Sequence, residues 1–81
     1  MVTAESIKSS IEAGMACDTV EVTGDGHHFE ALIVSGAFRG LPRIARHRLV
    51  YATLGDRMRE EVHALSMTTR TPEERAASPA D

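Results

Sequence analysis

The sequence predicts a small α+β domain: a three-stranded mixed sheet with its helices on one face. Three observations lead to this class. The spacing of apolar residues is helical near the N-terminus and becomes strand-like between residues 17 and 35. A glycine-rich turn, Gly24-Asp25-Gly26, divides the strand-like stretch into two halves. A long helical connection, 36–61, then leads to a third strand, which favours a parallel, right-handed crossover.

Length and composition limit the chain to one domain with a small core. It has 81 residues, of which 42% are apolar and 26% are charged. No apolar run is long enough to cross a bilayer, and the first residues lack the pattern of a signal peptide, so we expect a cytoplasmic protein without membrane contact. The single cysteine, Cys17, excludes an internal disulfide, and we expect it to be a small, partly buried residue.

The first predicted element is a helix over residues 3–15. Ile7 and Ile11 lie one turn apart and form an apolar stripe, and Thr3 is placed to cap the first turn. Gly14 is the candidate stop signal. A helix of this length is not stable alone, so we expect it to pack on the sheet.

Two strands are expected next, joined as an antiparallel hairpin. Residues 17–23 alternate apolar and polar side chains, and residues 29–35 contain a continuous apolar run that is typical of an inner strand. The turn between them places His27 and His28 at the tip of the hairpin or at the start of its second strand.

The long helix is expected over residues 43–60, after a connection in which Phe38 turns back into the core. Gly55 falls inside this helix and predicts a bend or a close contact there. The apolar stripe of the helix is broad and consists of Ile44, Ala45, Leu49, Val50, Ala52, Leu54 and Met58.

A third strand is expected over residues 62–69, followed by a short helical turn. Thr71 is placed as the cap of that turn and Pro72 as its first helical residue. We therefore expect a single domain over residues 1–75 and a flexible tail over 76–81.

Positive charge is concentrated between Gly36 and Gly55. That stretch has His47 and no acidic residue, although the whole chain has a net charge of −3. Such a patch can steer an anionic partner, whereas an ordinary solvated helix face explains the same pattern without one. The four arginines of the patch are Arg39, Arg43, Arg46 and Arg48.

Sequence motifs of common enzyme classes are absent. The chain has no phosphate-binding glycine loop, no His-Glu-x-x-His motif and no Ser-His-Asp arrangement. Glu60 and Glu61 lie close to His63 in the sequence, but the solvated end of a helix accounts for them. We therefore do not expect an enzyme.

Several linked motifs resemble the BolA family in their order and spacing. The resemblance covers about residues 3–75, and the loop of the form Gly-Asp-Gly-x-His-Phe is most similar to the IbaG branch. It implies a fold similar to class II KH domains, with the order helix-strand-strand-helix-strand. The motifs are Gly24-Asp25-Gly26-His27-His28-Phe29, Phe38-Arg39-Gly40, Arg46-His47-Arg48-Leu49-Val50-Tyr51, Val62-His63-Ala64-Leu65-Ser66 and Thr71-Pro72-Glu73-Glu74.

The resemblance also implies a role beside a monothiol glutaredoxin in iron–sulfur cluster assembly, transfer or iron sensing. In such complexes a [2Fe–2S] cluster is shared with a glutaredoxin cysteine and glutathione, and the BolA-like partner supplies histidines. Here these are His63, at the start of the third strand, and His28 or His27 from the loop. His28 is the better match because it directly precedes Phe29. If the short loop does not reach the cluster, His63 is the only ligand.

This ligand set is chemically reasonable. Neutral imidazole is a good ligand for iron, and protonation removes the lone pair that it offers. Strict alternation along the third strand would place His63 on the same side as Leu65 and Met67, toward the core, but a residue at the start of the strand can still reach the edge. We expect no tightly bound cofactor when the protein is alone, and a monomer or a weak dimer.

Nucleic-acid binding by a KH-like transcriptional regulator is the alternative function. Some BolA-like proteins are described as transcriptional regulators, and the four arginines of the patch suit phosphate contacts. The Gly-x-x-Gly clamp of KH domains is not evident, because three residues separate Gly36 from Gly40. With 4% aromatic residues, the chain also has few platforms on which bases could stack.

Overall fold

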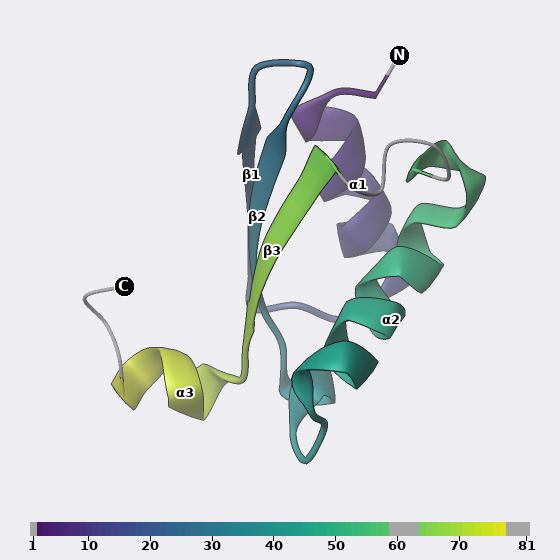
Figure 1. The fold of residues 1–81 in the computed structure, drawn as a ribbon. Helices are drawn as coiled ribbons and strands as arrows, with labels where there is room; N and C mark the ends of the chain where they lie inside the picture. The colour runs from purple at the N-terminus through teal and green to yellow at the C-terminus, as the bar shows by residue number, and fades with distance from the viewer. Residues whose placement is uncertain (1, 59–63, 78–81) are drawn as a thin grey trace.

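The computed structural model describes residues 2–58 and 64–77 (Figure 1). The order of its elements confirms the predicted helix-strand-strand-helix-strand chain and the α+β class. The helices and strands are α1 (Ala4–Gly14), β1 (Thr19–Gly24), β2 (Phe29–Val34), α2 (Arg43–Leu54), β3 (Leu65–Arg70) and α3 (Pro72–Ala77), with 3₁₀ turns at Gly36–Phe38 and Gly55–Met58.

The sheet has the mixed topology that the sequence predicts, with β2 in the centre. β1 and β2 are antiparallel, and Gly24 pairs with Phe29 next to the turn. β2 and β3 are parallel, and their pairing runs from Phe29 and Leu65 to Val34 and Arg70. Figure 1 shows α1 and α2 on one face of the sheet and α3 beyond the end of β3.

One hydrophobic core lies between the sheet and the two longer helices. Phe38 is fully buried, which confirms that the connection after β2 turns back into the core. The buried apolar side chains of this core are Ile7, Ile11, Val20, Phe29, Ala31, Ile33, Phe38, Val50, Leu54 and Leu65.

The start and the end of α1 agree with their sequence signals. Thr3 Oγ1 accepts a hydrogen bond from the Ser6 N–H at 3.0 Å, and Ser6 Oγ accepts one from the Thr3 N–H at 3.0 Å. These two bonds satisfy N–H groups that a helix start leaves unpaired. Gly14 has a further role, because a Cβ at this position would lie 2.7 Å from Thr53 Cβ. The glycine therefore allows α1 and α2 to pack closely.

The long helix is shorter than predicted. α2 ends at Leu54 because Gly55 adopts a left-handed φ of +59°, and a 3₁₀ turn follows it. A continuous helix over residues 43–60 is therefore wrong at residues 55–58, and the glycine marks the end of α2, not a bend. Residues 59 and 60 of the predicted helix lie outside the described residues.

The broad apolar stripe predicted for this helix is also wrong in part. Val50 and Leu54 are buried, whereas Ile44 is 62% exposed and Leu49 is 39% exposed. Only one side of α2 faces the core, so a stripe that wide cannot be buried as a whole.

The remaining boundaries differ from the predictions by a few residues. β1 starts at Thr19, two residues later than expected, and β3 extends to Arg70. Residues 62 and 63 of the predicted third strand lie outside the described residues. α3 continues to Ala77, beyond the predicted domain end at residue 75. No helix in the described part of the chain is long and apolar enough to span a membrane.

Candidate functional site

The tip of the β1–β2 hairpin carries two adjacent histidines on a fixed backbone. The Oδ1 atom of Asp25 accepts hydrogen bonds from the N–H groups of His27 at 2.8 Å and His28 at 2.9 Å. The Asp25 N–H donates in turn to the His28 carbonyl at 3.2 Å. Gly26, with a φ of +95°, supplies the left-handed residue that the turn needs.

The two histidine N–H groups, His28 first, hold the pKa of the Asp25 carboxyl below its ordinary value. Asp25 is therefore ionised at neutral pH and remains an acceptor. The backbone of the tip is set by this carboxylate and does not depend on the imidazoles.

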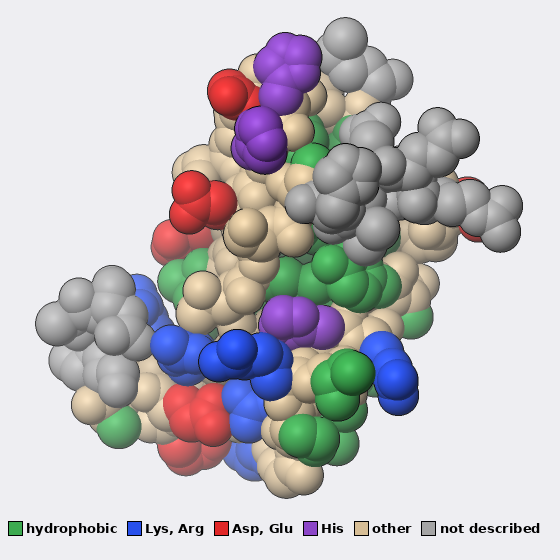
Figure 2. Space-filling view, in the orientation of Figure 1, with side chains coloured by type: hydrophobic (Ala, Val, Ile, Leu, Met, Phe, Trp, Pro, Cys, Tyr) green, Lys and Arg blue, Asp and Glu red, His purple; other side chains and the backbone are tan. Residues whose placement is uncertain are grey.

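The imidazoles of His27 and His28 are exposed, and neither makes a hydrogen bond to another described residue. Figure 2 shows two histidine side chains side by side at the upper end of the molecule, where Figure 1 places the hairpin turn. Ring nitrogens that are not engaged elsewhere can act as metal ligands. The tip thus offers two candidate nitrogen ligands with no competing partner among the described residues.

The start of β3 lies beside this hairpin. Phe29, which directly follows His28, pairs with Leu65, the first residue of β3. His63 precedes Leu65 by two residues in the sequence and lies outside the described residues. Its role as a ligand, alone or with His28 or His27, stays a prediction.

The residues of the tip suit partial ligation of a metal centre. Within residues 2–58 and 64–77, no three His, Cys, Asp or Glu side chains cluster to hold a metal on their own. Two neighbouring imidazoles can instead complete a cluster whose other ligands come from a partner.

Cys17 is partly buried, as predicted. Burial raises the pKa of its thiol, and the nearby carboxylates of Glu12 and Asp18 add to this effect. The thiolate is the form of cysteine that binds metals. The raised pKa therefore makes Cys17 a poor ligand.

A second candidate site lies at the opposite end of β3. It is an open groove of about 750 Å³ between the first half of α2 and the strand, and Glu74 and Ala77 of α3 also line it. The α2 wall carries Arg43, Arg46 and His47, and the strand wall carries Met67–Arg70. Figure 2 shows arginine side chains and one histidine gathered where α2 approaches β3.

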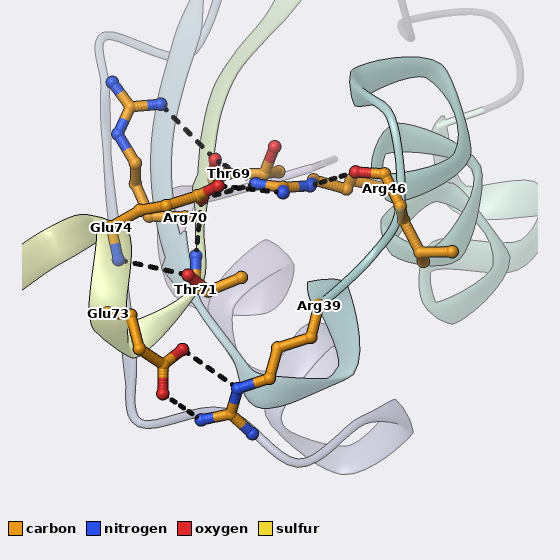
Figure 3. A network of polar contacts seen from close by, with 8 residues as sticks. Arg39, Arg46, Thr69, Arg70, Thr71, Glu73 and Glu74 are labelled. Atoms are coloured by element: carbon orange, nitrogen blue, oxygen red, sulfur yellow. Dashed lines mark hydrogen bonds and ion pairs between the residues drawn. The ribbon is translucent and has the colours of Figure 1, made fainter.

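Arg46 connects three elements at the base of this groove (Figure 3). Its Nε donates to the Leu41 carbonyl at 2.8 Å, and its Nη1 donates to the Thr69 carbonyl at 3.3 Å. The same guanidinium forms a bidentate pair with Glu74, with distances of 2.6 and 3.0 Å. It also lies over the Phe38 ring, 5.9 Å from its centroid. The Arg46 side chain is 13% exposed, so its main role is structural.

Glu74 and Thr71 form a reciprocal cap at the start of α3. Thr71 Oγ1 accepts from the Glu74 N–H at 3.1 Å, and the Glu74 carboxylate accepts from the Thr71 N–H at 2.9 Å. This confirms Thr71 as the cap and Pro72 as the first helical residue. Arg46 and the Thr71 N–H together lower the pKa of Glu74 to about 2.

Arg39 forms a second bidentate pair, with Glu73, at 2.9 and 2.6 Å. Both side chains are largely exposed, and the guanidinium lowers the pKa of Glu73 to about 2. Two of the four arginines of the predicted patch are thus neutralised by carboxylates from α3. Arg43 and Arg48 are exposed and form no ion pair with any described residue.

Sequence reasoning gave no site role to Asp25, Glu73 or Glu74. Asp25 was predictable, because an aspartate in a turn commonly accepts from N–H groups two residues further on. The glutamates were recognised only as part of a capped turn. Nothing in the sequence relates them to arginines 28 and 34 residues away.

Comparison with known proteins then decides the family. The sequence model of the BolA-like protein family matches residues 1–74. The chain belongs to the BolA-like family. It is 34% identical over 77 residues to human BolA-like protein 1, which covers 83% of this chain and 56% of that protein. It is 45% identical over 51 residues to the DNA-binding transcriptional regulator BolA of Vibrio cholerae, which covers 63% of this chain and 48% of that protein.

The chain spans about half the length of these two curated relatives. A solved structure agrees with the fold along almost the whole chain. The BolA homologue of Coxiella burnetii superposes with a TM-score of 0.76 at 46% identity, covering 94% of this chain and 99% of that one. The predicted BolA resemblance and fold class are therefore confirmed.

Proposed function

We propose that this BolA-like protein is an IbaG-like partner of a monothiol glutaredoxin and contributes histidine ligands to a shared [2Fe–2S] cluster. The glutaredoxin cysteine and glutathione supply the other ligands. The protein then acts in cluster assembly, transfer or iron sensing in the cytoplasm, and catalyses no reaction of its own.

The observation that supports this proposal is the geometry of the hairpin tip. His27 and His28 are adjacent and exposed, and they are not engaged by other described residues. Asp25 fixes their backbone, so less conformational entropy is lost when a ligand atom is immobilised. A surface with these properties suits a ligand that a second protein must complete.

The connectivity of the sheet supports a shared site with His63. Phe29 and Leu65 are paired, so the residues before them approach the same end of the sheet.

When bound, a cluster with imidazole ligands has a higher reduction potential than one held by thiolates alone. The histidines of this chain hold it only as neutral imidazoles. Protonation of an imidazole removes the lone pair that binds iron, so we expect ligation by histidine to weaken in acid.

The test is anaerobic reconstitution of a monothiol glutaredoxin with glutathione, iron and sulfide, followed by titration with this protein. We expect the visible absorption and circular dichroism of the cluster to change and to saturate. His63→Ala should reduce this change most, and His28→Ala should reduce it more than His27→Ala. His47→Ala is the matched control, because His47 lies in the groove at the other end of β3. An unchanged spectrum, or equal effects of His63→Ala and His47→Ala, contradicts the proposal.

Duplex DNA binding is the second candidate function. Two observations favour it: the DNA-binding relative in Vibrio cholerae, and the guanidinium groups of Arg43 and Arg48, which are exposed and form no ion pair with a described residue. Affinity should fall with rising salt. Each lost phosphate contact should reduce the slope of the logarithm of the binding constant against the logarithm of the salt concentration by about 1. Arg43→Ala and Arg48→Ala test this directly, with Arg39→Ala as the control because Arg39 is paired with Glu73. No binding at low salt excludes this function.

A further inference from the structure

β3 has one edge that no other strand of the described residues covers. The order of the sheet is β1-β2-β3, so β3 pairs with β2 on one side only. Its other edge faces the groove beside α2, and Met67–Arg70 line that groove. An edge strand of this kind presents N–H and C=O groups that can pair with a further strand.

The hydrogen bonds at the end of β3 show which backbone N–H and C=O groups point toward the groove. The Arg70 carbonyl accepts from the Ser35 N–H on the β2 side, whereas the Thr69 carbonyl accepts from Arg46 on the α2 side. The N–H and C=O groups of successive strand residues point to opposite edges of the strand. The N–H and C=O of Met67 therefore point to the same edge as those of Thr69, toward α2. No described residue pairs with the Met67 N–H and C=O on that edge.

The groove beside this edge is cationic. Arg43 and His47 lie one turn apart on α2, so their side chains share one face, and both line the groove. The one carboxylate in the lining, that of Glu74, is already paired with Arg46. The chain as a whole has a net charge of −3, so most of its surface repels an acidic segment. The positive groove therefore directs such a segment to this one place on the surface.

We propose that the free edge of β3 binds an extended acidic segment of a partner protein as a fourth strand. The Met67 N–H and C=O pair with the backbone of the segment, and Arg43 and His47 contact its carboxylates. The ladder ends at Thr69, whose carbonyl Arg46 already occupies. This inference does not depend on the cluster proposal, because the tip lies at the other end of β3.

Two other occupants fit the observations less well. A second copy of this chain, paired edge to edge, would bring two cationic grooves together, and like charges repel. A nucleic-acid backbone offers only acceptors at its phosphates, so the Met67 carbonyl would be left without a donor. A peptide strand supplies both donors and acceptors at the spacing that an edge requires.

The probe is a fluorescein-labelled, N-acetylated octapeptide of alternating glutamate and valine, mixed with the full chain at low salt. We expect an increase in fluorescence anisotropy and slower hydrogen exchange at the Met67 amide. Replacing the glutamates by lysines tests the charge requirement. N-methylation of all internal residues keeps the charge but removes the peptide donor to the Met67 C=O and places methyl groups on the pairing edge. Loss of the strand pairing should weaken binding about tenfold.

Arg43→Glu and Arg48→Glu are the matched protein variants. Both residues are exposed on α2 and change the net charge equally, but only Arg43 lines the groove. We expect Arg43→Glu to weaken binding of the acidic peptide at least as much as N-methylation does, and Arg48→Glu to leave the affinity nearly unchanged. Equal effects of both variants, or equal binding of the N-methylated peptide, overturn the proposal. The proposal is also overturned if a duplex DNA of equal charge binds more tightly than the peptide and Arg43→Glu weakens its binding too. It is overturned as well if the free chain associates with itself and Arg43→Glu changes that self-association.

Discussion

The hairpin tip and the base of the α2–β3 groove use their polar side chains in opposite ways. At the tip, Asp25 fixes the backbone, and the imidazoles of His27 and His28 make no hydrogen bond within residues 2–58 and 64–77. At the groove base, the side chain of Arg46 is itself fixed, and it joins α2 to β3 and α3. Side chains that already hold the fold together are poorly placed to bind a partner, whereas those on a fixed backbone are ready to do so.

This contrast changes how the arginine-rich stretch is understood. By sequence, Arg39 and Arg46 belong to the same basic patch as Arg43 and Arg48. In the structure the first two are paired with glutamates, and the last two are exposed and form no such pair with the part of the chain that the structure describes. Any anionic partner of this face should therefore depend on Arg43 or Arg48.

Arg46→Ala should give the largest change in stability. It removes the donors to the Leu41 and Thr69 carbonyls and uncovers the Phe38 ring, and we expect a loss of about 2 kcal/mol in the free energy of unfolding. For a domain of this size, the thermal midpoint should fall by about 10 °C. Arg39→Ala is the control, because its exposed pair with Glu73 adds little. Equal midpoints for the two variants would remove the structural role of Arg46.

A smaller effect is expected from acid. The pKa of Glu73 and of Glu74 is about 2 in the folded protein, against an ordinary value of 4.5. Because folding lowers these pKa values, the stability they contribute is present above pH 4.5 and is lost as the pH falls toward 2. Urea unfolding measured between pH 4.5 and 2 should show that the free energy of unfolding falls less with acid in the Glu73→Gln, Glu74→Gln double variant than in the unchanged protein. An unchanged pH dependence would mean that these pairs do not persist in solution.

The smallest effect on stability, with a clear effect on function, is expected at the tip. Asp25→Ala removes the acceptor of the His27 and His28 N–H groups at an exposed turn, so the thermal midpoint should change little. The loosened tip should nevertheless reduce the spectral change of the glutaredoxin-bound cluster. Asp25→Asn keeps a side-chain oxygen acceptor and should retain most of that change. A full spectral response from Asp25→Ala would show that the fixed backbone is not needed.

Much of the fold followed from local signals in the sequence. Thr3 and Thr71 were identified as caps because a hydroxyl acceptor at a helix start acts within three residues. The hairpin and the parallel crossover followed from the turn residues and the length of the connection. These features depend on neighbours in the chain, which the sequence displays directly.

The parts that sequence reasoning missed depend on contacts between distant residues. The exposure of Ile44 and Leu49 is set by how α2 lies on the sheet. The pairing of Arg46 with Glu74 requires the first turn of α3 to lie within reach of a side chain from α2, and no spacing in the sequence encodes that approach. The tip histidines were found through the family resemblance, and the contribution of Asp25 became visible only with its hydrogen bonds.

The most direct test of the central claim is pulsed electron paramagnetic resonance of the reduced cluster. The complex is assembled from unlabelled glutaredoxin and this protein labelled with ¹⁵N at histidine. Direct ligation predicts strong ¹⁵N hyperfine couplings from this chain, which His63→Ala, or His28→Ala together with His27→Ala, should weaken. A reduced cluster that shows no ¹⁵N coupling while both proteins remain bound would contradict histidine ligation by this protein.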